Sequence, residues 1–273
     1  MNSNTSDKLS IRVISAIIGI AVVLAILIYA GKTGVRILTA AVGIMALIEY
    51  FILVFPDPAR NIDRLLCTVF GMLMLIDRIF GPLAVSFVVP SFFLMFIFFL
   101  FRAKSYAANL HQCLFLMSLS TLGIVYLTFL LPYFSRLYEI KNGLQWSLVA
   151  LIIPWAYDTG AYFVGRKMGK QKLYLVVSPG KTLEGAVGGA LLTFAALAFF
   201  RYFFFKNLNL PDLLLLSILG SLFAQIGDLF ESLIKRGLGI KDSGRLIPGH
   251  GGILDRLDAL LFTFPFVYTY ARF

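Results

Sequence analysis

The sequence predicts an all-α protein that crosses a membrane several times, with about nine transmembrane helices. Hydrophobic residues make up 59% of the 273 residues, only 14% are charged, and phenylalanine alone occurs 27 times. A soluble domain is about one quarter charged, and a soluble chain this apolar would lack the polar side chains needed to cover its surface. Lipid is the solvent that tolerates such a surface.

Apolar runs close to the ~20 residues that cross the hydrocarbon core define the expected helices. Eight runs are clear, and a ninth, Leu65–Ile76, is short and bounded by Arg64 and Asp77. We count it as a short, tilted or half-inserted helix; without it the count is eight. The first run is longer than the core of a signal peptide, so we expect it to be retained. The eight clear runs are Ser10–Ala30, Gly34–Phe55, Phe80–Phe101, Leu114–Phe134, Gln145–Gly165, Gly185–Phe205, Pro211–Phe230 and Gly252–Tyr270.

The chain is expected to be one integral unit, because no repeat and no long linker divides it into soluble domains. Residues 1–144 supply N-terminal helices, and residues 145–273 carry the polar segments in which we look for chemistry. Cys67 and Cys113 both lie in apolar stretches, which is typical of structural thiols, and two cysteines make no disulfide framework.

The net charge of +10 has two interpretations, contact with anionic partners or the usual excess of Lys and Arg in cytoplasmic loops. For so apolar a chain the second explains most of the excess, and nucleic acid is not an expected partner. With nine spans and a cytoplasmic N-terminus, sixteen of the 24 Lys and Arg residues lie inside and eight outside. We therefore expect an integral membrane protein, of the plasma membrane if the source is bacterial, with its active site on the cytoplasmic side.

Charged residues gather in two windows, Trp155–Gly185 and Gln225–Asp258, which hold 17 of the 38. Ionisable groups at membrane depth are expensive and usually face a polar cavity. Each window begins in an expected span and continues into a cytoplasmic loop, so the topology brings the two together. In the first window Asp158 shares a helix face with Tyr162; it is either a functional acid or a packing carboxylate paired with a lysine.

The first window ends in Ser178-Pro-Gly-Lys-Thr-Leu-Glu, which looks like half of a phosphate-binding P-loop. Leu175 stands where the P-loop requires its first glycine, so the match fails. We still expect a Ser-Pro-Gly turn leading into a helix, where free backbone N–H groups and the helix dipole favour anions. Lys181 and Thr182 would add a cation and a hydroxyl there.

The second window places Asp228, Glu231, Ser232 and Lys235 on one stripe of an otherwise apolar helix, at i, i+3, i+4 and i+7. Salt bridges alone would explain two or three of the window's charges but not all of them.

A loop with Pro248-Gly-His-Gly-Gly follows, and then a helix on which Asp255 and Asp258 are i, i+3 neighbours. Carboxylates without a His or Cys cluster suit Mg²⁺ rather than zinc. The glycines around His250 allow a ligand to approach the backbone closely.

This window contains the pattern Ser232-x-x-Lys-Arg-x-x-x-x-Lys-Asp-x-x-x-x-x-Pro-x-His-Gly-Gly-x-x-Asp-Arg-x-Asp258. It resembles the signature of the phosphatidate cytidylyltransferases, or CDP-diacylglycerol synthases. The upstream elements Trp-x-x-Asp-x-x-Ala-Tyr and Ser-Pro-x-Lys-Thr-x-Glu-Gly are similar to that family too. The resemblance covers about Trp155 to Asp258, and the N-terminal half matches only as generic membrane helices.

The resemblance implies an enzyme that uses CTP, phosphatidic acid and Mg²⁺ to make CDP-diacylglycerol and pyrophosphate at the membrane. Its lipid phosphate is already anionic, so the site must mainly suppress repulsion between two polyanions and align them. A homodimer is also compatible with the resemblance. The implied catalytic residues are Lys181, Asp228, Lys235, Arg236, Lys241, His250, Asp255 and Arg256. The implied substrate-binding residues are Ser178, Thr182, Glu184, Ser232 and Asp242. The implied metal ligands are Asp228, Asp255 and Asp258, with Asp158 and Glu231 as supporting acids.

Two other functions stay open. Another CTP-dependent membrane enzyme, such as a polyprenol kinase, would transfer the γ-phosphoryl group instead. A secondary transporter would also carry intramembrane charges, but it is expected to show inverted repeats with broken helices, and no such repeat is evident in the sequence.

Overall fold

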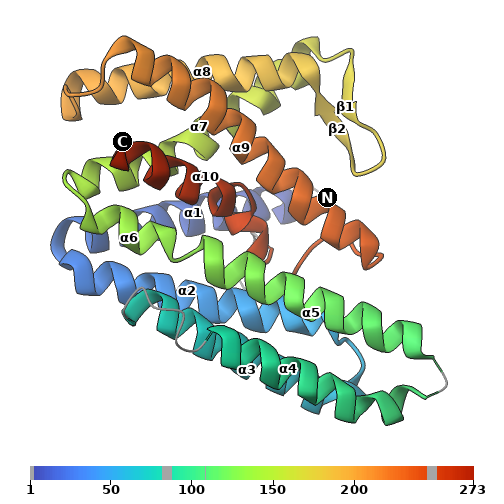
Figure 1. The fold of residues 1–273 in the computed structure, drawn as a ribbon. Helices are drawn as coiled ribbons and strands as arrows, with labels where there is room; N and C mark the ends of the chain where they lie inside the picture. Colours follow the sequence, from blue (N-terminus) through green and yellow to red (C-terminus); the bar gives the residue numbers. More distant parts are fainter. Residues whose placement is uncertain (1–2, 82–87, 108, 245–250) are drawn as a thin grey trace. The chain divides into compact units, whose positions relative to one another are not determined.

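The computed structural model describes residues 3–81, 88–107, 109–244 and 251–273 of the chain. Within these ranges the chain forms ten α-helices, two short 3₁₀ helices and one β-hairpin (Figure 1). The helices are α1 Ser3–Tyr29, α2 Gly31–Val54, α3 Asn61–Phe80, α4 Val88–Arg102, α5 Leu110–Leu130, α6 Tyr133–Glu139, α7 Gly143–Met168, α8 Leu183–Phe204, α9 Leu210–Gly237 and α10 Leu254–Arg272. The strands are β1 Lys172–Tyr174 and β2 Ser178–Thr182, and the 3₁₀ helices are Pro58–Arg60 and Ala103–Tyr106.

The predicted all-α membrane architecture is confirmed. In the described part of the chain, six helical stretches are long and apolar enough to cross a bilayer. They are Gly31–Val54, Val89–Tyr106, Leu110–Glu139, Gly143–Met168, Leu183–Phe204 and Leu210–Gly237. Each expected segment overlaps at least one described helix, but α1, α3 and α10 are not among these six, so the count of nine is not confirmed.

Prolines explain where the helices depart from the expected runs. The short ninth segment is part of the 20-residue helix α3, which extends to Phe80, the residue at which the next run was expected to begin. α3 ends at an extended Gly81 that precedes a proline, and a residue before proline disfavours the helical conformation. Pro132 likewise separates α5 from the short helix α6 inside what was expected to be one continuous span.

The β-hairpin corrects the expected turn at Ser178-Pro-Gly. These residues lie in β2, which pairs antiparallel with β1 and aligns Lys172 with Thr182 and Tyr174 with Ser178. In a two-stranded sheet both strands are edges, and an edge strand tolerates the missing N–H of Pro179. Helix α8 begins at Leu183, directly after the hairpin and not directly after a Ser-Pro-Gly turn.

The chain divides into two compact units. The first comprises Met1–Ser135 with Asp242–Leu254, and the second comprises Arg136–Lys241 with Asp255–Phe273. In the first unit α2 packs against α3 and α5, and the buried Tyr50 hydroxyl donates a 2.8 Å hydrogen bond to the carbonyl of Leu119.

A second polar contact of the first unit surrounds Asp63 of α3, whose carboxylate is fully buried. It accepts hydrogen bonds from Arg102 Nε at 2.7 Å and from the Tyr106 hydroxyl at 2.8 Å. A carboxylate at this burial needs such donors, because an unpaired buried charge is strongly unfavourable. Asp63 thus fixes the end of α4 against α3.

In the second unit α7 and α8 pack with their backbones unusually close. A Cβ added to Gly160 would come within 2.6 Å of the Gly188 carbonyl oxygen. Small residues at such crossings are the usual means by which membrane helices gain packing contacts. The close packing brings the C-terminal half of α7 against the start of α8, where the polar residues of the first window lie.

Candidate functional site

A cavity of about 480 Å³ with several polar and charged side chains in its lining lies in the second unit, among α7, β2, the start of α8 and α9. Five of the candidate site residues named from the sequence line it, three from strand β2 and one each from α7 and α9. Arg166, Gln225 and two tyrosines, Tyr157 and Tyr162, also line it. The predicted lining residues are Asp158, Ser178, Lys181, Thr182 and Asp228. The structure therefore confirms that the two charged windows meet.

Lys181 and Asp228 form the central ion pair of this cavity, with Nζ and Oδ2 2.5 Å apart. The lysine comes from β2 and the aspartate from α9, and about a quarter of each side chain is exposed. The hydroxyl of Ser232, one turn further along α9, donates to the same carboxylate at 3.3 Å. The exposed part of Lys181 is its aliphatic stem, because Nζ itself is buried beside the carboxylate.

Thr182 and Glu184 have roles in the fold itself. The Thr182 hydroxyl accepts from the N–H of Gly185 and so caps α8, and the N–H of Leu183 donates to the carbonyl of Gln171. Glu184 accepts from the backbone N–H groups of Lys170 and Gln171 at 3.1 Å. Two of the helix-terminal N–H groups that the sequence assigned to an anion are therefore already bonded within the protein.

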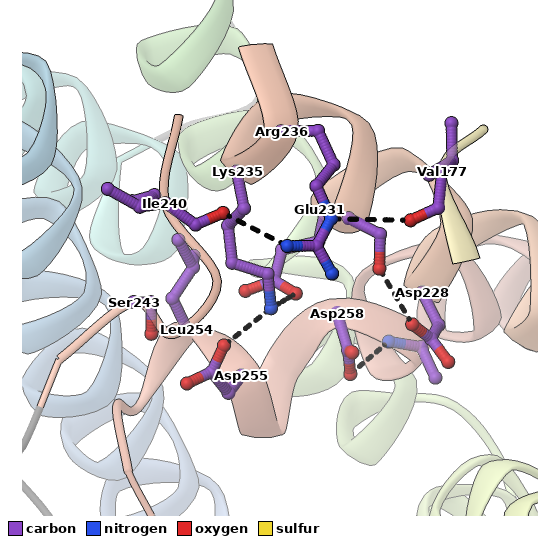
Figure 2. Close-up of polar contacts among 12 residues, drawn as sticks. Val177, Asp228, Glu231, Lys235, Arg236, Ile240, Ser243, Leu254, Asp255 and Asp258 are labelled. Carbon is purple, nitrogen blue, oxygen red and sulfur yellow. Dashed lines mark hydrogen bonds and ion pairs between the residues drawn. The ribbon is translucent and has the colours of Figure 1, made fainter. Parts of the chain in front are cut away.

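Lys235 joins two acids of the second window. Its Nζ lies 2.5 Å from Glu231 Oε2, on the same helix, and 2.6 Å from Asp255 Oδ1 on α10 (Figure 2). Glu231 is fully buried, and the lysine and Asp255 side chains are 12% and 16% exposed. One cation thus contacts two carboxylates at a depth where water screens their charges little.

Asp258 lies between the two ion pairs. Figure 2 shows Asp255 beside Lys235 at one side, Asp228 at the other, and Asp258 between them. Asp258 accepts from the N–H of Ala259 at 2.7 Å, and its charge and that of Asp158 both interact repulsively with Asp228. Asp158 and Asp228 therefore line the cavity, and Asp258 is the third acid of this group, close enough to interact with both.

This acidic group fits Mg²⁺ by donor chemistry, because every candidate ligand is a carboxylate oxygen. Among the residues that the structure describes, no three His, Cys, Asp or Glu side chains enclose an ion by themselves. Mg²⁺ usually takes only one or two carboxylates and completes its shell with waters and substrate phosphates. The residues present suit an ion that binds together with a phosphorylated substrate.

The other predicted cations are dispersed. Arg236 donates from Nε to the carbonyl of Val177 in the hairpin turn and from Nη1 to the carbonyl of Ile240, both at 3.4 Å (Figure 2). Lys241 and Arg256 are exposed. Asp242 is exposed too, and it belongs to the first unit. His250 lies outside the described residues.

Tyr157 and Gln225 line the cavity but are not among the residues predicted from sequence. The Tyr157 hydroxyl donates to the Gln225 side-chain oxygen, and both side chains are largely buried. The sequence did contain an indication of both residues. Tyr157 directly precedes Asp158, and Gln225 lies three residues before Asp228 on the same face of α9. Neither residue is ionisable near neutral pH, so a pattern of charges does not include them.

Residues 10–273 match the model of a family described as the cytidylyltransferase family. A phosphatidate cytidylyltransferase of Staphylococcus aureus is 35% identical over 270 residues, which cover 94% of this chain and 96% of that protein. Proteins of the same name from Staphylococcus epidermidis and Staphylococcus haemolyticus are 41% and 47% identical. The matches to these two span 68% and 55% of this chain and 66% and 55% of the relatives' lengths.

Because Lys235 contacts both Glu231 and Asp255, its substitution is expected to change the stability of the protein. Lys235→Met should lower the free energy of unfolding by about 3 kcal/mol or more, because it leaves the carboxylates of Glu231 and Asp255 without their common cation. Adding Glu231→Gln should restore much of the loss, since it removes the more buried of the two charges. Thermal unfolding in detergent measures both effects, with Lys104→Met at an exposed lysine as the control. Equal midpoints for Lys235→Met and Lys104→Met would contradict the role of this lysine.

Proposed function

This chain belongs to the cytidylyltransferase family, and we propose that it transfers the cytidylyl group of CTP to phosphatidic acid. The products are CDP-diacylglycerol and pyrophosphate. The observation that carries the proposal is the cavity in which Lys181 and Asp228 pair beside further acids, within helices that cross a membrane. It offers cations for phosphates and carboxylates for Mg²⁺ where a lipid headgroup can enter.

The reaction needs charge neutralisation more than proton transfer. An anionic phosphate oxygen of phosphatidic acid attacks the α-phosphorus of CTP, and the bond from that phosphorus to the β-bridging oxygen breaks. Pyrophosphate leaves with the electron pair, so no side chain has to remove a proton before the attack. The site must instead hold two polyanions in line and stabilise the charge on the leaving group.

Lys181 is the best-placed residue for a phosphate group. It lies in the cavity beside Ser178 of the same strand, whose hydroxyl is available to orient phosphate oxygens. Binding a phosphate at Lys181 would release Asp228 from its ion pair. The remaining predicted cations, Lys235, Arg236, Lys241 and Arg256, would contribute at the edge of the site.

Asp228 and Asp258 are the proposed Mg²⁺ ligands, with Asp158 in support. A bound Mg²⁺ would supply the positive charge that draws the phosphates of CTP and the lipid together. Asp255, the other ligand that the sequence predicts, is ion-paired with Lys235 and would bind metal only by giving up that partner. The release of Asp228 by an arriving phosphate would couple substrate binding to metal binding.

The alternatives differ in product. A polyprenol kinase would move the γ-phosphoryl group of CTP to a lipid alcohol, and a transporter would leave CTP intact. The names of the staphylococcal relatives favour cytidylyl transfer to phosphatidate.

We place the site on the cytoplasmic side, because that orientation puts sixteen of the 24 Lys and Arg residues inside. A homodimer remains a prediction from the family resemblance.

The reaction can be tested with purified protein, phosphatidic acid, Mg²⁺ and CTP labelled at either the α- or the γ-phosphate. We expect α-label in the lipid product and γ-label in pyrophosphate. Lys181→Ala should reduce turnover a few hundred-fold, since one charge-assisted contact in the transition state contributes roughly 2–4 kcal/mol. Lys206→Ala, an exposed lysine in the α8–α9 connection, should retain turnover. Appearance of γ-label in lipid would instead identify a kinase.

Metal binding can be measured apart from turnover by following Mn²⁺ with electron paramagnetic resonance in the presence of CTP. Asp228→Asn and Asp258→Asn should each weaken Mn²⁺ binding at least tenfold, because an amide is a poorer ligand than a carboxylate for a hard cation. The control is Asp57→Asn, which alters an exposed acid whose carboxylate accepts from the N–H of Ala59. If Mn²⁺ affinity is the same in all three variants, these acids are not the ligands.

Orientation is testable with single cysteines in a background that lacks the two buried natural ones. Val176, which is 84% exposed in the hairpin turn, and Gly237, at the end of α9, are suitable positions. Both should react with an impermeant maleimide only from the cytoplasmic side, and a cysteine at Lys206 only from the opposite side. Labelling of Val176→Cys from outside would reject the proposed orientation.

A further inference from the structure

A buried acid of the first unit, Glu49 of α2, contacts a segment of the family-like signature. Glu49 is only 2% exposed. Its carboxylate accepts hydrogen bonds from the backbone N–H of Ile253 at 2.8 Å and from that of Leu254 at 3.3 Å. The hydroxyl of Ser243 also donates to it. All of these residues belong to the same compact unit, although Glu49 is about 200 positions away in sequence.

The backbone around this carboxylate leaves room for it and for little else. A Cβ added to Gly252 would overlap the Glu49 and Ser243 oxygens, and one added to Gly244 would come within 3.0 Å of the Glu49 carboxyl carbon. The glycines at these two positions therefore allow the chain to close around Glu49. From sequence alone, Glu49 belongs only to a generic membrane helix.

The contacts also place a negative charge at the beginning of α10. Leu254 is the first residue of that helix, and the N–H groups of a first turn lack partners inside the helix. A carboxylate there satisfies the N–H of Leu254 and that of Ile253 just before the helix, and it interacts favourably with the helix dipole. Glu49 thus acts as a cap that another helix supplies, and the three donors compensate the burial of its charge.

We propose that Glu49 is a positioning residue for the active site. Its carboxylate accepts hydrogen bonds from Ser243 and Ile253. In sequence these two residues lie before and after Pro248 and His250, so the contacts fix the chain on both sides of that segment. By capping α10 it also sets where that helix starts, and therefore where Asp255, Arg256 and Asp258 follow. The expected effect on turnover rests on the proposed function, whereas the tether itself does not.

Glu49→Gln tests the proposal with little change of shape. One of the two carboxylate oxygens becomes an NH₂ group, which cannot accept from a backbone N–H, so at least one of the Ile253 and Leu254 contacts is lost. We expect turnover with CTP and phosphatidic acid to fall roughly 10- to 100-fold, the range seen when a partner that orients a site residue is removed. Amide hydrogen exchange of the peptide that contains Ile253 and Leu254 should accelerate at least tenfold. Gly252→Ala should reproduce both effects by displacing the carboxylate.

Tyr50→Phe is the matched control, because it removes a buried side-chain hydrogen bond from the neighbouring position of the same helix. If Glu49 only stabilised α2, the two variants would show the same exchange at Ile253 and Leu254 and the same turnover, and the proposal would be overturned. Faster exchange and lower turnover in Glu49→Gln alone would support it. If the wild-type protein shows no cytidylyl transfer, the proposed function fails, and the exchange comparison still decides whether Glu49 holds the segment.

Discussion

Lys235 places one positive charge between two carboxylates on neighbouring helices of a membrane protein, where little water is available to screen them. Glu231 is fully buried, and the energy of an unpaired charge at such a depth is high enough to decide how α9 and α10 are oriented. Once those helices are fixed, Asp228 and Asp258 lie toward the same region, and Lys181 reaches Asp228 from the hairpin. The arrangement of the site therefore depends on the ion pairs of Lys235 and Lys181.

The paired state also bears on how the site would admit the substrates that we propose for it. CTP and phosphatidic acid both bring negative charge, which a set of unpaired acids would repel. Here the lysines are held beside the acids, so an incoming phosphate can replace a carboxylate as the partner of a cation. Under the proposed function, the carboxylate that is released would then be available to a metal ion.

Much of this arrangement could be predicted from sequence, because helical periodicity is a local property. The polar stripe of α9 and the meeting of the two charged windows are both present in the structure. The partners of the charges were not predictable in this way. Asp228 pairs with Lys181 of the hairpin, and Asp255 of α10 pairs with Lys235 of α9. The partner of each charge depends on which helices pack together. The contacts of Glu49 could not be predicted from the sequence for the same reason.

The hairpin that carries Lys181 has one further consequence, for the behaviour of the protein outside its membrane. A two-stranded sheet normally exposes edges onto which strands of other molecules can add. Here β1 has only three residues and β2 contains Pro179, which has no N–H to donate. The pair is therefore a poor template for intermolecular sheet growth, so the exposed turn can project from the helices without promoting aggregation during synthesis or purification.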